Sequence, residues 1–369
     1  MSDGPLAGLR VVEMAGLAPA PFATTMLADH GAEVVRIDRT TPTVGEPDLL
    51  GRSRSVVHLD LKAPGAIDAV LELLDGADVL IEGYRPGVME RLGLGPEVVL
   101  ARNPRLVYGR MTGWGQTGPL AHAAGHDLNY VALSGVLGAV GPAGQAPTPP
   151  LNLVGDFGGG GLLLAFGVLA AIVERSHSGR GQVVDAAMVD GAAMLSTHLH
   201  SMLADGTWDG ERGDNIIDGG APYYRCYATS DDRYMSVGAI EPPFWALLLE
   251  GLGLSDEDLP DRDDRAQWPA LGERIAAVFA TRTRDDWAAV FAGTDACVEP
   301  VLDPREAPFA AANAARDVFV EVDGVVQPAP APRFDRTPPA TPRSRATAAA
   351  DDLAGWGLSD AALGLLTRR

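Results

Sequence analysis

The sequence predicts an α/β fold built on a parallel sheet. Short runs rich in Val, Ile and Leu are bounded by turn residues, and the segments between them include helical patterns. This alternation is typical of a Rossmann-like sheet whose strands are joined by helices. The expected strands are Leu9–Met14, Glu33–Ile37, Val79–Glu82 and Leu106–Arg110, and one expected helix carries its apolar face on Ala66, Ile67, Val70, Leu71, Leu73 and Leu74.

The turn after the first strand argues against a dinucleotide site. Residues 15–19 read Ala-Gly-Leu-Ala-Pro and lack the GxGxxG spacing that binds a pyrophosphate. Asp38 ends the second strand and could stand where a ribose-binding acid does. Without the glycines, we do not expect an NAD-dependent enzyme.

A second, smaller unit is expected after residue 222. Residues 162–205 look helical and apolar, and residues 206–222, rich in Gly and Asp, look like a linker. Strands are expected at Tyr223–Tyr227 and Arg233–Val237, followed by helices at Phe244–Leu252, Trp268–Ala280 and Asp285–Ala292. The expected division is a large α/β domain over 1–205, a linker over 206–222, a small α+β domain over 223–303 and a C-terminal segment over 304–369.

Length and charge restrict the possible partners. The 369 residues suffice for about two domains. A net charge of −20 argues against a nucleic-acid surface, because phosphate binding needs a basic stripe. Since Lys62 is the sole lysine, arginines must provide most of the cations for an anionic ligand. No uninterrupted apolar span of about 18 residues is present, and the nearest approach, Leu162 to Val173, predicts a buried helix and not a membrane span.

The two cysteines and the chain ends point to the cytoplasm. Cys226 and Cys297 cannot form a disulfide framework, and no CxxC spacing suggests a metal site. The N-terminus lacks the basic and apolar regions of a signal peptide, and the last three residues are no peroxisomal address. We therefore expect a cytoplasmic protein.

The segment from Gly125 to Gly161 carries the most informative chemistry. It contains His126 and, thirty positions later, Asp156, which Gly158–Gly161 follow closely. Glycines let a substrate approach the backbone, and their N–H groups can stabilise developing negative charge. Local sequence leaves plainer readings open, because a histidine is more often structural than catalytic and glycines often mark a turn or a close helix contact.

The whole chain resembles the family III CoA-transferase superfamily and, within it, the 2-methylacyl-CoA racemase branch. Asp156 matches the position of the covalent aspartate of the transferases. His126 with Asp127 matches the racemase pattern, since the transferases compared carry a tyrosine-type residue at the histidine position. The other matching runs are residues 9–13, 31–39, 60–62, 81–87, 112–119, 149–156 and 237–242.

The resemblance implies an architecture that the pattern alone does not. It implies a large α/β domain built from both chain ends, a small central α+β domain, and a homodimer of two interlocked subunits. Active sites would then lie between domains of different subunits, so that Glu241 of one chain could reach His126 of the other.

The resemblance also assigns chemical roles. His126 and Asp156 would flank the α-carbon of an acyl-CoA thioester and move a proton on opposite faces, and Glu241 would orient the imidazole. No metal or other cofactor is expected. The CoA part of the substrate is expected at Gly16, Leu17, Arg39, Leu59, Lys62, Gly83, Tyr84, Arg85 and Arg91.

Two competing functions follow from the same residues. In a CoA-transferase, Asp156 would attack the thioester and form a mixed anhydride. A CoA-binding protein without catalysis is the third possibility, which exchange of the α-proton with solvent would exclude. His126 and Glu241 favour the racemase.

Overall fold

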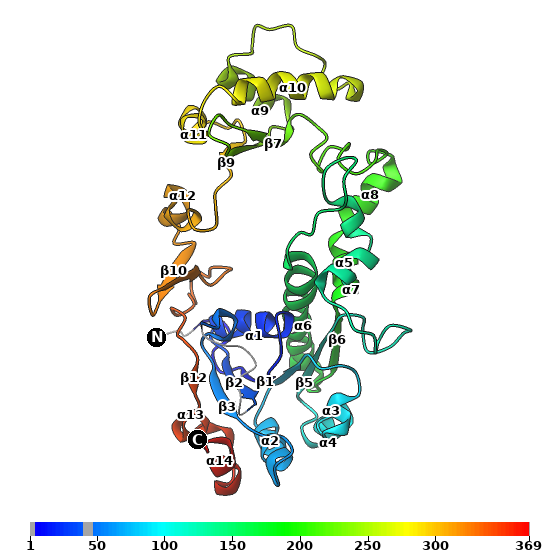
Figure 1. The fold of residues 1–369 in the computed structure, drawn as a ribbon. Helices are drawn as coiled ribbons and strands as arrows, with labels where there is room; N and C mark the ends of the chain where they lie inside the picture. The colour runs from blue at the N-terminus through cyan, green and yellow to red at the C-terminus, as the bar shows by residue number, and fades with distance from the viewer. Residues whose placement is uncertain (1–3, 40–46, 369) are drawn as a thin grey trace. The chain divides into compact units, whose positions relative to one another are not determined.

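The structure is a computed structural model that describes residues 4–39 and 47–368 (Figure 1). Its contacts divide the chain into two compact units. The first comprises Met1–Ser134, Leu151–Leu195 and Ala311–Arg369, and the second comprises Gly135–Pro150 and Ser196–Ala310. Residues 135–150 and 196–205, expected in the large domain, and the expected linker 206–222 all group with the second unit.

The first unit is built on a seven-stranded sheet whose neighbouring strands all pair in parallel, which confirms the predicted fold class. The order is β12-β3-β2-β1-β4-β5-β6. The chain thus reverses direction across the sheet at β1, as in Rossmann-like folds. The strands are β1 Arg10–Met14, β2 Glu33–Asp38, β3 Ser55–His58, β4 Val79–Glu82, β5 Val107–Thr112, β6 Val183–Ala187 and β12 Ala346–Thr347.

Helices cover both faces of this sheet, so its central strands are buried on both sides. Val11 faces the core beneath α1 and α6, whereas the next residue, Val12, faces the core beneath α2, α4 and α14. Val34 and Val35 on β2 alternate in the same way. These helices are α1 Pro19–Asp29, α6 Leu163–Ser178, α2 Ala66–Asp75, α4 Pro96–Arg102 and α14 Asp360–Leu366.

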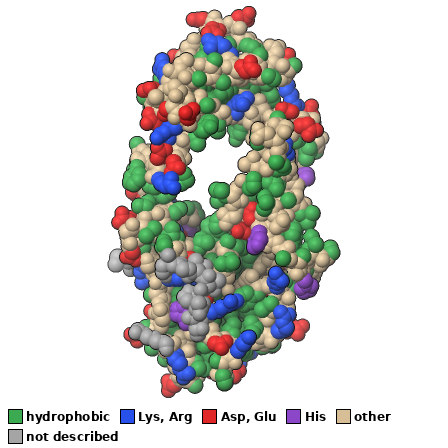
Figure 2. All heavy atoms as spheres, in the orientation of Figure 1, with side chains coloured by type: hydrophobic (Ala, Val, Ile, Leu, Met, Phe, Trp, Pro, Cys, Tyr) green, Lys and Arg blue, Asp and Glu red, His purple; other side chains and the backbone are tan. Residues whose placement is uncertain are grey.

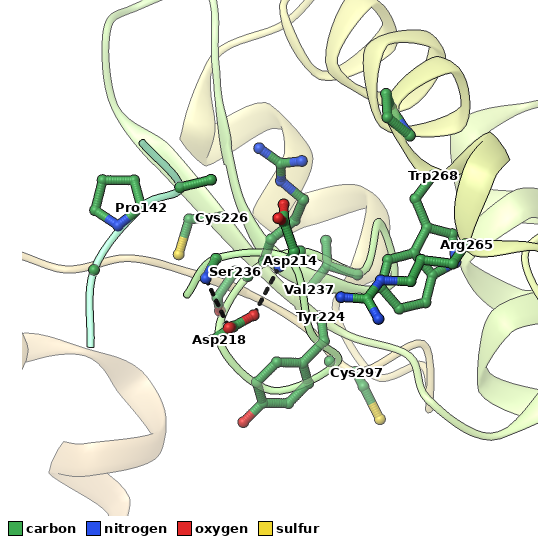
Figure 3. A pocket seen from close by; sticks show the side chains of 18 of the residues that line it. Pro142, Asp214, Asp218, Tyr224, Cys226, Ser236, Val237, Arg265, Trp268 and Cys297 are labelled. Carbon is green, nitrogen blue, oxygen red and sulfur yellow. Dashed lines mark hydrogen bonds between the residues drawn. The ribbon is translucent and has the colours of Figure 1, made fainter. Parts of the chain in front are cut away.

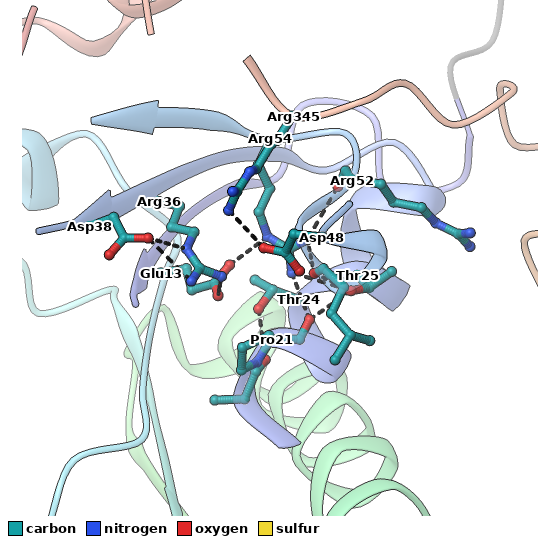
Figure 4. A network of polar contacts seen from close by, with 12 residues as sticks. Glu13, Pro21, Thr24, Thr25, Arg36, Asp38, Asp48, Arg52, Arg54 and Arg345 are labelled. Atoms are coloured by element: carbon teal, nitrogen blue, oxygen red, sulfur yellow. Dashed lines mark hydrogen bonds and ion pairs between the residues drawn. The ribbon is translucent and has the colours of Figure 1, made fainter. Parts of the chain in front are cut away.

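A buried ionic cluster joins β1 and β2 to the segment before β3 (Figure 4). The carboxylate of Glu13 accepts from Arg36 Nη1 at 3.1 Å and from Arg54 Nε at 2.5 Å, and none of the three side chains is more than 1% exposed. Arg36 also pairs with Asp38 at 3.3 Å. Because removing one partner would leave a buried charge unpaired, this cluster fixes the ends of the two central strands.

A π-helix, Leu153–Leu162, runs directly into α6. Its glycines touch backbone atoms of neighbouring helices: a Cβ at Gly159 would lie 2.6 Å from the nitrogen of Ala192, and one at Gly161 would lie 2.6 Å from the oxygen of Pro19. The glycines therefore permit close packing against α7, Met188–Leu195, and α1.

The second unit carries a three-stranded antiparallel sheet, β7-β8-β9. One face of this sheet, with Tyr227, Met235 and Val237, packs on Leu248 and Phe279 from two of the helices. The elements are β7 Tyr224–Ala228, β8 Tyr234–Gly238, β9 Val298–Pro300, α8 Thr197–Asp205, α9 Pro242–Leu252, α10 Trp268–Phe279 and α11 Arg284–Phe291. This unit is α+β, as expected.

The structure corrects the element prediction in three places. β3 was missed, and β6 interrupts residues 162–205, which were expected to be helical. The edge position of β6 leaves Val183 exposed, so that no continuous apolar run marks the strand. Within the Pro- and Ala-rich C-terminal segment, Asp323 and Gly324, both with positive φ, turn a hairpin of β10 Phe319–Val322 and β11 Val325–Pro328.

The remaining short helices of the described residues are α3 Val88–Arg91, α5 Asp127–Leu133, α12 Ala311–Ala315 and α13 Ala350–Leu353. In the first unit, α14 packs beside α2, and Trp356 is buried in the same core. The C-terminal segment from Ala311 therefore belongs to the α/β unit.

We expect Gly159→Ala to destabilise the protein by about 1–3 kcal/mol, the usual cost of overpacking. The added methyl group would meet the backbone of α7, which cannot turn aside as a flexible side chain could. Gly364→Ala is the matched control, because a Cβ there meets nothing within 4 Å and its backbone lies in α14. The free energy of unfolding of this control should rise by about 0.5–1 kcal/mol, because alanine is favoured over glycine inside a helix. Urea unfolding measures both, and equal stability of the two variants would contradict the packing role of Gly159.

Candidate active site

His126 is held at the start of α5. It is the N-cap residue, with an extended backbone (φ −131°, ψ 174°). Its N–H donates to Oδ1 of Asn129 at 3.0 Å, and its carbonyl accepts from the N–H of the same residue at 2.8 Å. This cap fixes the backbone, while the side chain of His126 stays exposed.

Asp156 lies in the first turn of the π-helix and is tied to the residue after His126. Its N–H donates to Oδ2 of the buried Asp127 at 2.7 Å. Its own Oδ2 accepts from Nδ2 of Asn152 at 3.1 Å. Asp127 Oδ1 is buried without a hydrogen-bond partner among the described residues. Asn152 was not among the predicted site residues, and Asp127 was named only as part of a motif, because no sequence pattern shows that these two side chains bind Asp156.

Burial raises the pKa of the Asp156 carboxyl above its ordinary value. The hydrogen bond from Asn152 lowers that pKa, the negative charge of Asp127 raises it, and the positive charge of His126 lowers it, but burial dominates. His126 and Asp156 are therefore close enough to interact electrostatically. A half-buried acid with a raised pKa beside an exposed imidazole suits proton transfer.

Aromatic side chains form the wall behind these groups. Tyr130 and Trp114 meet edge to face, with ring centroids 4.7 Å apart. Glycine is required opposite the tyrosine, because a Cβ at Gly113 would lie 2.1 Å from its ring and one at Gly125 would lie 2.7 Å away. Burial raises the pKa of Tyr130, and Asp156 adds to this effect, whereas the charge of Arg85 opposes it. Arg85 thus lies within electrostatic reach of the site.

The N–H groups of Gly158–Gly161, which were expected to stabilise negative charge on a substrate, are not free to do so. The helix already begins at Leu153, and the N–H of Phe157 bonds to the carbonyl of Asn152. The four glycine N–H groups lie inside the helix, where the backbone carbonyls one turn earlier accept from them. Close packing is the role that the structure supports.

A cavity of about 840 Å³ opens at the carboxyl ends of β1 to β4. In open parallel sheets, ligands bind at this edge where the strand order reverses. Arg39, Lys62 and Arg85 are exposed along it and supply positive charge. Six of the nine residues expected to bind CoA line this cavity: Arg39, Leu59, Lys62, Gly83, Tyr84 and Arg85.

The other three expected residues lie outside the cavity lining. Gly16 and Leu17 follow Ala15, which does line it, and Leu17 is 66% exposed. Arg91 folds back onto its own helix, with Nη1 3.2 Å from where a Cβ of Gly87 would stand.

Buried acids hold the walls of this cavity in place. Asp38 is 2% exposed, pairs with Arg36 and accepts the N–H of Arg39 at 2.8 Å. Glu82 at the end of β4 accepts the N–H of Tyr84 at 2.7 Å. Both carboxylates thus bind groups of the protein itself. Asp38 is therefore not available to bind a ribose hydroxyl.

Glu241 lies in the second unit, as the exposed N-cap residue of α9. The same unit holds another cavity, of about 1260 Å³, lined by residues of β7, β8 and β9 and by the start of α10 (Figure 3). Both cysteines, Cys226 and Cys297, line it as free thiols. Burial raises the pKa of the Cys297 thiol and the charge of Glu241 adds to this effect, so the acid lies within electrostatic reach of the cavity lining.

Within residues 4–39 and 47–368, no three His, Cys, Asp or Glu side chains lie close enough to hold a metal ion. Four methionines could offer a pliable apolar surface to an acyl chain; of these, Met111, Met188 and Met202 are buried and Met194 is 66% exposed. Only Met194 therefore stands open to a ligand.

The chain belongs to CoA-transferase family III, whose profile matches residues 6–350. It is 50% identical to alpha-methylacyl-CoA racemase of Mus musculus over 335 residues, which cover 90% of this chain and 87% of the relative. The Homo sapiens protein of that name is 46% identical over 90% of this chain and 87% of its own length. Acetyl-CoA:oxalate CoA-transferase of Acetobacter aceti is 31% identical, over 88% of each chain.

Solved structures share the fold. A CaiB/BaiF family protein from Brucella suis superposes with a TM-score of 0.80 at 24% identity, covering 95% of this chain and 97% of that one. The Mycobacterium tuberculosis protein Rv3272 gives a TM-score of 0.77 at 26% identity, over 94% of this chain and 97% of that one.

We expect Asp156→Asn to stabilise the folded protein at neutral pH. Because the folded state raises the pKa of Asp156, it holds the proton more tightly than the unfolded state does. The free energy of unfolding therefore falls as the pH rises from the ordinary aspartate pKa of about 3.9 through the higher folded value. The neutral amide avoids this loss, so the advantage of the variant should shrink as the pH is lowered.

Urea unfolding across this pH range measures the difference. Asp205→Asn is the matched control, because the hydrogen bonds from Thr207 lower the pKa of Asp205. This substitution should therefore destabilise the protein at neutral pH, and the loss of stability should shrink as the pH is lowered. A variant of Asp156 that loses stability equally at every pH would contradict the raised pKa.

Proposed function

We propose that the protein interconverts the (2R) and (2S) forms of 2-methylacyl-CoA thioesters by moving a proton at the α-carbon. The observation that carries this proposal is that His126 lies within electrostatic reach of Asp156, whose pKa is raised by burial. The names of the two mammalian relatives support the substrate class.

In this mechanism, neutral His126 removes the α-proton from one face of the thioester and becomes an imidazolium. The electron pair of the broken C–H bond passes into the enolate. Protonated Asp156 then returns a proton to the opposite face, which inverts the carbon and leaves a carboxylate. The reverse direction exchanges the two roles, so that each enantiomer uses one group as base and the other as acid.

We propose that CoA occupies the cavity at the ends of β1 to β4. Arg39, Lys62 and Arg85 would neutralise its phosphates, since guanidinium and ammonium groups bind phosphate oxygens well. Arg85 also lies within electrostatic reach of Tyr130, which connects the cavity with the acid–base pair. Gly16, Leu17 and Arg91 complete the proposed CoA site.

Glu241 is the proposed partner of the imidazole. A carboxylate that accepts from the histidine ring would fix its orientation and stabilise the cation formed during the reaction. Following the interlocked architecture, we propose that Glu241 of one subunit serves His126 of the other.

A CoA-transferase is the alternative function, supported by the transferase relative from Acetobacter aceti. Asp156 would then be a nucleophile that must be ionised, and burial opposes that form. The racemase needs the protonated form in one direction, which burial favours.

The decisive experiment incubates one pure enantiomer of a 2-methylacyl-CoA in deuterium oxide. We expect either enantiomer to converge on nearly equal amounts of both, with deuterium at the α-carbon. His126→Ala and Asp156→Ala should each lower turnover by at least ~10²-fold, because each removes one proton carrier. Arg91→Ala should mainly weaken substrate binding.

The transferase alternative makes the opposite prediction. Hydroxylamine would trap an acyl anhydride on Asp156, and turnover would require an added carboxylate acceptor. Trapping mapped to Asp156, without deuterium at the α-carbon, would replace the racemase proposal.

We propose that a second copy of the chain covers an apolar surface of the first unit. This surface comprises Leu162, the last residue of the π-helix, with Phe166 and Val173 on α6, which continues it. Spacings of four and seven residues place the three on one side of the continuous helix. These side chains are 44%, 68% and 61% exposed. Neighbouring helices add exposed Leu133, Leu153, Met194 and Leu195, and Figure 2 shows apolar side chains among charged ones on the visible face.

A membrane is the competing occupant of this surface. The continuous helix Leu153–Ser178 is long and apolar enough to cross one, with 39% of its most apolar window buried, although core helices of soluble proteins meet the same test. It is longer than the expected Leu162–Val173 and only partly buried. The net charge of −20 disfavours an anionic lipid surface, and so we propose that a second copy of the chain covers this surface.

We also propose that the protein works in a reducing compartment, the cytoplasm. The two cysteines are free and exposed, which supports this proposal.

Phe166→Asp should therefore convert a dimer into monomers without unfolding the unit, because the side chain is already exposed. Light scattering after gel filtration measures the mass. Val98→Asp is the matched control, since Val98 is 44% exposed on α4 at the other sheet face. Unchanged mass of the Phe166 variant, or binding of the wild type to lipid vesicles that this substitution abolishes, would overturn the proposal.

A further inference from the structure

The backbone around Glu241 is held from both sides. Before it, the N–H of Gly238 donates to the carbonyl of Cys297 at 2.9 Å, and the N–H of Ile240 donates to the carbonyl of Gly238 at 2.9 Å. After it, the N–H of Trp245 donates to the carbonyl of Glu241 at 3.0 Å, which begins α9. The carbonyl of Ile240, directly before Glu241, is bound by a side chain from elsewhere in the unit.

That side chain is Arg262, in the loop between α9 and α10. Its Nη2 donates to the carbonyl of Ile240. Its guanidinium lies over the ring of Tyr223, 4.2 Å from the centroid, and over the ring of Trp245 at 4.9 Å. The carbonyl of Arg262 accepts from Nε1 of Trp268 at 2.8 Å. The side chain is 17% exposed, so these contacts are largely shielded from water.

We infer that Arg262 is a positioning residue that acts through Glu241, an inference that rests on the proposed function. A hydrogen bond from a charged donor is stronger than a neutral one, and here it fixes the peptide group that leads into the N-cap. Trp245, whose N–H bonds to Glu241, is also one of the two rings that hold the guanidinium. Arg262 thus clamps the residue before Glu241 to the first turn of the helix after it.

Stability alone explains this arrangement poorly. Nη1 of Arg262 is buried without a hydrogen-bond partner among the described residues. An unsatisfied buried donor costs free energy, and an apolar side chain between the two rings would avoid that cost. The planar guanidinium is needed because it can stack on aromatic rings and donate in its own plane at the same time, which an ammonium group cannot do.

The test compares Arg262→Met with Glu241→Gln in the deuterium exchange assay. Methionine keeps an apolar stem but removes the donor and the charge. We expect kcat to fall roughly 10-fold to 100-fold, the range that misplacement of a catalytic group produces. KM should change little, because only residues of the first unit line the proposed CoA cavity. The apparent pKa of the base in the kcat profile should shift downward, in the same direction as in Glu241→Gln.

A double-mutant cycle separates positioning from a general structural effect. If Arg262 acts through Glu241, the variant carrying both substitutions should be no slower than Glu241→Gln alone. Arg282→Met is the matched control, because Arg282 also stacks on a tryptophan of this unit, Trp287, at 4.8 Å. Its kcat and pH profile should equal those of the wild type. If Arg262→Met does not fold, Arg262→Lys enters the same cycle.

The inference would be overturned if the reductions in kcat of the two single variants multiplied in the double variant. It would also be overturned if a folded Arg262 variant kept the pH profile of the wild type. Either result would leave the proposed function intact. Wild-type protein that places no deuterium at the α-carbon would instead overturn the proposed function, and the inference with it.

Discussion

One hydrogen bond, from the N–H of Asp156 to Oδ2 of Asp127, ties together the two segments that carry the candidate acid–base pair. Asp127 is buried and adjoins His126, so the bond sets the spacing between the start of α5 and the first turn of the π-helix. The same carboxylate raises the pKa of Asp156 through its charge. Asp127 therefore fixes where the acid lies, and its charge adds to the burial that chiefly raises the pKa of Asp156.

This bond depends on how closely the helices approach. A Cβ at Gly155 would lie 2.5 Å from Oδ2 of Asp127, and the glycines that follow let the helix settle against α1 and α7. The wider π-helical turn shifts the register by one residue relative to an α-helix, which is a common feature of functional sites. The same short segment therefore has to pack closely against its neighbours and to hold Asp156 in the candidate site.

The sheet was predictable because its central strands are buried on both faces and read as apolar runs, as Val79–Glu82 does. β6 was not, since an edge strand with exposed Val183 lacks that run. His126 and Asp156 were found by family resemblance, whereas local sequence left structural roles open. The partners of Asp156 were beyond prediction, because the bond to Asp127 depends on tertiary packing and no pattern separates a π-turn from an α-turn.

The return of the C-terminal segment to the first unit has a consequence for biosynthesis. Val12, Val35 and Leu80 form a sheet face whose core is completed by Trp356 and by Leu366 on α14. These covering residues leave the ribosome only after the second unit has been made, roughly 14 to 55 seconds after Leu80 at ~5–20 residues per second. Throughout that interval the nascent chain exposes the apolar face of an incomplete sheet, while most of the second unit, Ser196–Ala310, is being made. Until translation ends, these apolar side chains therefore lack part of the core that covers them in the folded unit.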